Sequence, residues 1–220
     1  MDNIILYQFE NGSQYNLKRL VDDYGKMEAD DSQGFIFKEY DEHFLRAVYW
    51  QKKIHKNYRY NINTQEFEEI KEEIINVAEY FIQIKERKLI VFGSKMMAQK
   101  IVTLIGIVSK YACSITEYFI DIEKLVNRLC LDKTIMFQKM KLTDIIIDRG
   151  LLVNCNVNLI SLDNPKEVVE HYIKNIVVIS FKLNPIATNI TIYKTGKISI
   201  SKVTEDEKDE VLRQIIKVMC

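Results

Sequence analysis

Apolar and polar positions alternate along much of this chain, and alternation of this kind predicts β-strands. In the first half the segments that predict strands are residues 4–9, 34–40, 44–51 and 58–63, and the last of these alternates. They are rich in aromatic and β-branched residues, which strands favour. Segments 34–40 and 44–51 follow each other closely enough to predict a hairpin.

Two other segments of the first half have helical spacing. Residues 16–24 predict a short helix. In residues 66–77 the apolar positions Phe67, Ile70, Ile74 and Ile75 recur every three to four residues, with glutamates between them. That spacing places the apolar side chains on one helical face and predicts an amphipathic helix.

The first half closes with a unit that recurs at the end of the chain. Residues 80–85 and 88–92 predict two strands joined by a turn, and Ser94 is a suitable N-cap for a helix over 95–111. The second half has the following predicted elements: helices over 115–130, 166–172 and 205–219, and strands over 141–148, 151–161, 176–183, 189–194 and 197–202. Pro165 and Thr204 mark the starts of the last two helices.

A shift of 108 residues superimposes residues 80–92 on residues 188–200. The aligned pairs are Ile82 with Ile190, Ile84 with Ile192, Ile90 with Ile198, and Phe92 with Ile200. We therefore predict an α+β fold of two similar halves, 1–110 and 111–220, with antiparallel sheets. Each half ends in a β-hairpin followed by a long amphipathic helix. Two alternatives stay open: the halves form one continuous domain, or the two units are alike by chance.

The hairpin–helix segments 80–108 and 189–219 resemble the TATA-binding-protein-like architecture. The resemblance covers about a quarter of the chain. It implies a curved antiparallel sheet with a helix lying across it. It does not extend to that family's basic DNA-binding surface or its intercalating phenylalanine pairs, so it supports architecture more than DNA binding.

Charge adds a local feature to this picture. The chain carries 31 Lys+Arg and 31 Asp+Glu, which argues against a globally basic nucleic-acid binder. Residues 43–65, however, contain no acidic residue, and cations alternate there with aromatic rings. Cations that contact phosphates, beside rings that stack on bases, are typical of nucleic-acid binding. The candidate binding residues are Arg46, Trp50, Lys52, Lys53, Lys56, Tyr58 and Arg59.

The alternative is a solvated hairpin whose aromatic residues face the core. The glutamates at 66–73 could also neutralise the basic segment.

Catalytic motifs are absent from the sequence. Gly93-Ser94-Lys95 lacks the spacing of nucleotide-binding loops. Asp144 and Asp148 share a strand face and support a metal-dependent nuclease only weakly. The three histidines are scattered, and the cysteines 113, 130, 155 and 220 lack zinc-site spacing. We predict no cofactor and no metal, and we favour a non-enzyme.

The principal functional hypothesis is a non-catalytic nucleic-acid-binding or sensing protein. The alternative is a protein-interaction subunit: a homodimer, or part of a prokaryotic mobile-element or phage-defence complex. No signal peptide and no apolar run of about 20 residues is seen, so we expect a cytoplasmic protein without a membrane partner.

Overall fold

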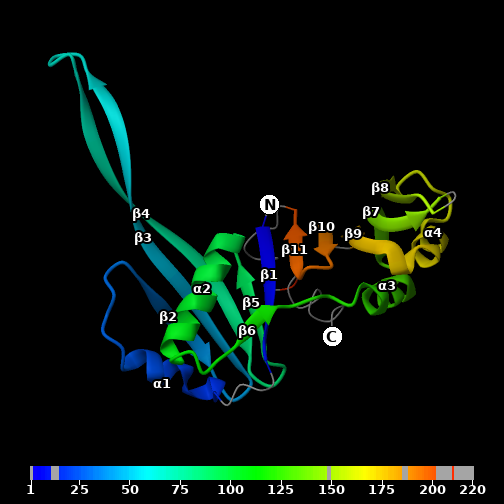
Figure 1. The fold of residues 1–220 in the computed structure, drawn as a ribbon, viewed down its shortest axis with the longest axis horizontal. Coiled ribbons are helices and arrows are strands. Elements are labelled where there is room, and N and C mark those ends of the chain that lie inside the picture. Colours follow the sequence, from blue (N-terminus) through cyan, green and yellow to red (C-terminus); the bar gives the residue numbers. More distant parts are fainter. Residues whose placement is uncertain (1, 11–14, 148–149, 185–187, 202–209, 211–220) are drawn as a thin grey trace. The chain divides into compact units, whose positions relative to one another are not determined.

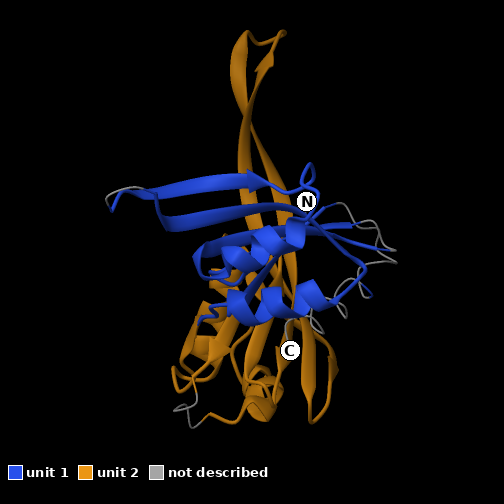
Figure 2. Cartoon of the chain, turned by 90° about the vertical axis from the view of Figure 1, so that its right-hand side faces the viewer, with its two compact units in different colours: residues 1–6, 117–220 blue, residues 7–116 orange. Residues whose placement is uncertain are grey.

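A computed structural model describes residues 2–10, 15–147, 150–184, 188–201 and 210. The chain forms two compact units, coloured separately in Figure 2. Unit 2 comprises residues 7–116, and unit 1 comprises residues 1–6 and 117–220. The first strand, β1 (Asp2–Phe9), contributes residues to both.

Unit 2 is built on an antiparallel meander with the strand order β2-β3-β4-β5. Its elements (Figure 1) are η1 (Leu17–Arg19), α1 (Leu20–Gly25), β2 (Gln33–Tyr40), β3 (Phe44–Asn61), β4 (Glu66–Gln83), β5 (Lys88–Phe92) and α2 (Lys95–Val108). β3 and β4 each have 18 residues, far more than the neighbouring β2 and β5. The two central strands therefore continue beyond the four-stranded part of the sheet.

One face of this sheet forms the core of unit 2. Every second residue of β3, from Leu45 to Tyr49, is buried, and so are Ala78 and Tyr80 of the paired strand β4. Phe35 of β2 packs on this face with its ring centroid 5.1 Å from that of Tyr80. This alternation is expected of a sheet with one buried face.

Helix α2 follows directly after β5 and covers the buried face. Its apolar stripe, which includes Ala98, Ile101 and Ile105, is fully buried. The Lys100 ammonium on α2 donates a hydrogen bond to the Gln51 side chain on β3. The Ser94 hydroxyl accepts a hydrogen bond from the Met97 amide at 3.3 Å, which confirms the predicted N-cap.

Unit 1 has the strand order β8-β7-β9-β10-β11-β1, again with antiparallel neighbours. The chain enters it after β6 (Ile115–Glu117). Its other elements are α3 (Ile122–Leu131), β7 (Ile135–Ile146), β8 (Leu152–Asn158), α4 (Pro165–His171), η2 (Ile173–Asn175), β9 (Ile176–Leu183), β10 (Thr188–Tyr193) and β11 (Lys197–Ile200). Phe137, Ile179 and Phe181 are buried in its core, as is the apolar side of α3.

The turn between β10 and β11 requires glycine. Gly196 has φ +82°, and a Cβ atom at this position would overlap the Tyr118 carbonyl oxygen. The Gly196 carbonyl accepts a hydrogen bond from the Leu6 amide at 3.0 Å. This close approach fixes β1 beside the hairpin, so a side chain at this turn would disturb unit 1.

The predicted α+β fold class is wrong. The structure is mostly antiparallel sheet, with 50% strand and 23% helix, and its four α-helices in the described residues are short. Two mistaken predictions account for much of the difference. Residues 66–77, predicted as a helix, belong to strand β4. Residues 115–130, also predicted as one helix, form β6 and the 10-residue α3.

Several local predictions are confirmed. The strands at 88–92 and 176–183 have the predicted bounds, and Pro165 lies in the first turn of α4. Apart from residue 210, the helix expected at 205–219 lies outside the described residues, as do its cap Thr204, Asp148 and Cys220. None of the described helices combines the length and apolar character needed to span a membrane.

Candidate interaction arm

Residues 52–77 form a two-stranded hairpin that extends from the four-stranded part of unit 2 (Figure 1). We call this segment the arm. β2 pairs with β3 only as far as Gln51, and β5 pairs with β4 only from Glu79 onward. The arm strands pair in unbroken register up to Asn61 opposite Glu66. Neither outer edge of the arm is therefore paired with β2 or β5.

The unbroken register assigns every arm side chain to one of two faces, because directly paired residues share a face and successive residues alternate. Tyr58 pairs with Glu69, and Tyr60 pairs with Phe67. These four residues lie on the same face as Ile54, which we call the aromatic face. The opposite face, continuous with the core face of unit 2, is more polar.

The aromatic face exposes large apolar side chains. Six of its residues, Ile54, Tyr58, Tyr60, Phe67, Ile75 and Val77, are between 47% and 70% exposed. The Tyr60 and Phe67 rings contact each other edge to face, with centroids 5.2 Å apart. On the opposite face, Ile74 is the exposed large apolar residue of the described arm. Apolar exposure is thus concentrated on one side of the hairpin.

Charges on the arm cancel. Its cations are Lys52, Lys53, Lys56, Arg59 and Lys71, and its anions are Glu66, Glu68, Glu69, Glu72 and Glu73. The Lys56 ammonium lies 3.2 Å from the Glu69 carboxylate, and Lys52 lies 3.5 Å from Glu73. The strand pairing sets this arrangement, since it places the acidic strand β4 directly against the basic strand β3.

The candidate nucleic-acid-binding residues divide between two places. Five of them, Lys52, Lys53, Lys56, Tyr58 and Arg59, lie on the arm. Among them, the Tyr58 hydroxyl donates to the Glu69 carboxylate at 3.3 Å, and Arg59 stands opposite Glu68. Arg46 and Trp50 lie in the four-stranded part of the sheet instead.

Arg46 and Trp50 have structural surroundings. The Arg46 guanidinium donates to the Glu79 carboxylate at 2.6 Å and lies 5.2 Å from the centroid of the Phe81 ring. Trp50 is half-buried and packs beside Gly34, where a Cβ atom would come within 3.1 Å of the indole nitrogen. Arg46 therefore lies apart from the cations of the arm, whereas Trp50 lies on the same face of β3 as Lys52, two residues before it and opposite Val77.

Sequence reasoning missed β4 as a partner in this site. The glutamates of β4 and its exposed apolar residues Phe67, Ile75 and Val77 were assigned to a helix. A useful signal was present: the short turn between residues 61 and 66 joins two segments of similar length. Hairpin connections of this length are common between antiparallel strands.

The rest of the described chain offers little for catalysis. No group of three or more His, Cys, Asp or Glu side chains in the described residues could hold a metal ion. Asp144, the described member of the weak nuclease pair, has φ 56°, and its amide donates to the Asn154 side chain. Burial raises the pKa of the Cys130 thiol to about 11, and the Glu170 carboxylate adds to this shift. A high pKa keeps the thiol protonated and poorly nucleophilic.

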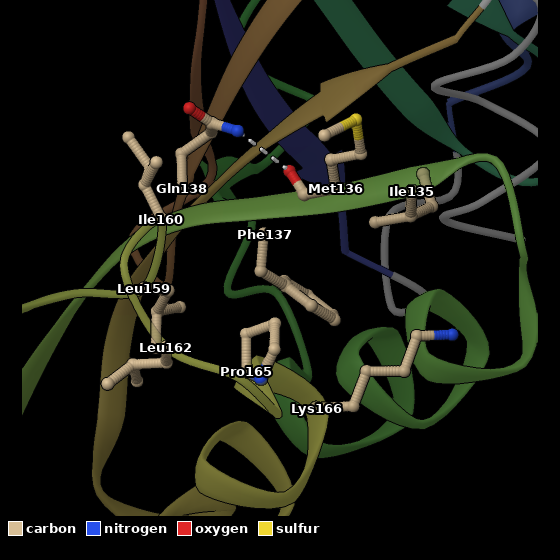
Figure 3. A pocket seen from close by; sticks show the side chains of 9 residues that line it. All are labelled: Ile135, Met136, Phe137, Gln138, Leu159, Ile160, Leu162, Pro165 and Lys166. Carbon is tan, nitrogen blue, oxygen red and sulfur yellow. Dashed lines mark hydrogen bonds between the residues drawn. The ribbon is translucent and has the colours of Figure 1, made fainter.

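A pocket of about 210 Å³ lies in unit 1 beside β7 and the start of α4 (Figure 3). It is lined mainly by apolar residues, among them Phe137, Leu159 and Pro165. Its ammonium group, on Lys166, donates to the Cys130 carbonyl at 2.8 Å. The pocket is smaller than typical ligand sites of about 300–1,000 Å³. Lys166, the cation among the residues that line the pocket, is already hydrogen-bonded to a backbone carbonyl. We therefore take the arm as the stronger candidate site.

Comparison with known proteins adds no relative. No protein-family model matches the chain, and no curated protein matches it in sequence. The arm's role is therefore argued from its geometry and charge.

Proposed function

We propose that this chain is a non-catalytic binding protein whose contact element is the arm and whose partner is a protein. One observation carries the proposal: the arm exposes its aromatic face while its charges cancel. Contiguous exposed apolar surface marks interaction sites on soluble proteins. A strand that binds phosphates would leave its cations available, whereas Lys52 and Lys56 are paired with glutamates.

The arm's length supports the same conclusion. An isolated two-stranded hairpin is at best marginally stable in water, because it buries little apolar area. Ile54, Tyr58 and Phe67 do not contribute to the core of unit 2, since each is at least 65% exposed. A protein surface that covered these side chains would supply the burial that the arm lacks within its own unit.

Nucleic acid is a second candidate partner, and one observation favours it. Lys53 and Arg59 form no ion pair within the described residues, and both lie on the polar face of the arm. Their cations could contact phosphates while Tyr58 stacks at the edge of the same strand. The TATA-binding-protein-like resemblance and membership of a larger defence complex also stay predictions.

Site-specific photo-crosslinking in the native cells tests the proposal. The photoreactive residue p-benzoylphenylalanine replaces Tyr58 on the arm. In a matched control it replaces Tyr40 of β2, which is 62% exposed compared with 65% for Tyr58. We expect a discrete adduct from the Tyr58 position that survives nuclease and is removed by protease.

Other outcomes contradict the proposal in different ways. A nuclease-sensitive adduct at Tyr58 would identify nucleic acid as the partner. Equal adducts at both positions would show that the arm is not the preferred contact. Absence of any adduct at Tyr58 would remove the arm as a contact element.

A further inference from the structure

The outer edge of β3 on the arm has no neighbouring strand among the described residues. The Lys52 amide donates outward to the carbonyl of Ser32, the residue before β2, at 2.8 Å. Because β3 keeps an unbroken register with β4, every second residue after Lys52 has its amide and carbonyl directed outward. The outward groups belong to Ile54, Lys56, Tyr58 and Tyr60.

Both faces of this edge carry positive charge. Lys52 and Lys56 lie on the aromatic face, whereas Lys53 and Arg59 lie on the polar face. β3 has no acidic residue from Lys52 to Asn61. A strand added along this edge would place its side chains beside these cations on both of its faces.

We propose that the outer edge of β3 at residues 52–61 receives an extended acidic segment of a partner protein as an added β-strand. The added strand continues the position of β2 along β3, hydrogen-bonds to the outward backbone groups, and pairs its carboxylates with Lys53 and Arg59, the β3 arm cations that have no ion pair among the described residues. Its apolar side chains pack beside Ile54 and Tyr58. This inference rests on the proposed function, since it names the partner's chemistry.

Charge complementarity selects this occupant over a second copy of the chain. A twofold dimer joined through strand edges pairs β3 with β3 or β4 with β4, because such an interface is isologous. The first pairing opposes cations, and the second opposes the glutamates of β4. Pairing β3 of one copy with β4 of another is complementary, but it is a heterologous contact, which leads to a ring or a filament of many copies. A separate acidic segment satisfies the edge without either problem.

Lysines on an exposed edge also protect it from unwanted pairing. This protection acts against apolar and basic strands. It leaves the edge open to an acidic strand, so the same cations can both prevent aggregation and select the partner.

A peptide titration of the full chain tests the inference. The probe is a fluorescein-labelled peptide of ten residues that contains the sequence Glu-Glu-Thr-Val-Glu-Glu. In an extended strand, each pair of neighbouring glutamates places one carboxylate on each face. Control peptides carry lysine in place of glutamate, or N-methyl groups along one edge. Fluorescence anisotropy is measured at about 50 mM salt, where exposed charges interact over more than about 10 Å.

We expect the acidic peptide to bind at least about tenfold more tightly than the basic one. N-methylation should abolish the difference, because it removes the backbone donors that strand addition needs. The variant Lys53→Glu with Arg59→Glu should reverse the preference. Its matched control is Lys18→Glu with Lys38→Glu, which changes the net charge equally at exposed positions outside the arm and should leave the preference unchanged.

Three results would overturn the inference. They are equal affinity for both peptides, unchanged binding after N-methylation on either edge, and concentration-dependent self-association that Lys53→Glu with Arg59→Glu abolishes. If the peptides fail while the Tyr58 crosslink to a protein persists, the proposed function stands and only the edge assignment falls. Circular dichroism of each variant checks that the chain is folded.

Discussion

Replacing Glu69 and Glu73 with glutamine tests whether β4 neutralises the basic strand. Glu69 lies 3.2 Å from the Lys56 ammonium, and Glu73 lies 3.5 Å from that of Lys52. Glutamine keeps the shape of each side chain and its capacity to accept a hydrogen bond from Tyr58. The double variant therefore removes two negative charges with little change in packing. It releases Lys52 and Lys56 of β3, and also Lys71 of β4, whose ammonium lies 3.5 Å from Glu69.

The salt dependence of DNA binding gives the expected magnitude. In the native chain only Lys53 and Arg59, of the four β3 arm cations, lack an ion pair among the described residues. If both contact phosphates, log K falls with log salt at a slope of about −1.8, or about tenfold between 50 and 200 mM. Releasing Lys52 and Lys56 doubles the contacts to about four, and the slope becomes about −3.6. Affinity then falls about 150-fold over the same range.

The assay is an anisotropy titration of a short labelled duplex at several salt concentrations. Because exposed ion pairs contribute only about 0.2–1 kcal/mol each, the variant should stay folded, which urea denaturation checks. A slope that is the same in both proteins would refute the argument that strand pairing neutralises the arm. Glu42→Gln, at an exposed position in the β2–β3 turn, is the control for a general change in net charge.

Three further predictions concern stability. Tyr80→Phe should leave the free energy of unfolding within about 1 kcal/mol or raise it, because the buried Tyr80 hydroxyl has no hydrogen-bond partner among the described residues. A loss above about 2 kcal/mol in urea denaturation would reveal a partner. Ser94→Ala should lower the free energy of unfolding by about 0.5–2 kcal/mol, because it removes the N-cap of α2. Ser94→Asp, which can still accept the amide hydrogen bond, should retain most of that stability, and equal losses in the two variants would contradict the capping role. Hydrogen bonds from the Lys124 amide and side chain lower the pKa of Asp121, so its carboxylate stabilises the fold above the ordinary carboxyl pKa, and that contribution is lost as pH falls through the lowered value. Asp121→Asn should keep the cap of α3 and reduce the loss of thermal stability at acid pH, measured as Tm against pH. If Tm falls with pH equally in both proteins, Asp121 does not supply this contribution.

The local sequence pattern was sufficient to predict those elements whose burial in the fold matches their own hydrophobicity. β9 is an apolar run in the middle of its sheet, and its bounds match the prediction at residues 176–183. Ser94 caps α2 because a hydroxyl at that position satisfies an otherwise unpaired amide, which depends on the chain nearby. These features require no knowledge of distant residues.

Residues 66–77 show where local pattern failed. Phe67, Ile70 and Ile74 recur at helical spacing, yet the segment is a strand with both faces exposed. Alternation marks a strand only where one face is buried, because burial is what selects apolar residues at every second position. Neither face of the arm is buried, so burial did not select apolar residues at every second position of β4. Phe67 and Ile75 lie on the aromatic face, whereas Ile70 and Ile74 lie on the opposite face, and together they give the spacing of a helix.

The candidate site, like the fold, was predicted in part from the sequence and in part only by the tertiary structure. The sequence by itself determined that cations and aromatic rings are concentrated in residues 43–65 and that glutamates follow them. Only the tertiary structure decided that these glutamates lie beside the cations in a paired strand, that Tyr58 and Phe67 are exposed on one face, and that Arg46 is held by Glu79. The physical reason is that charge and exposure depend on which strands pair, and pairing joins residues up to 39 positions apart in the β3–β4 register.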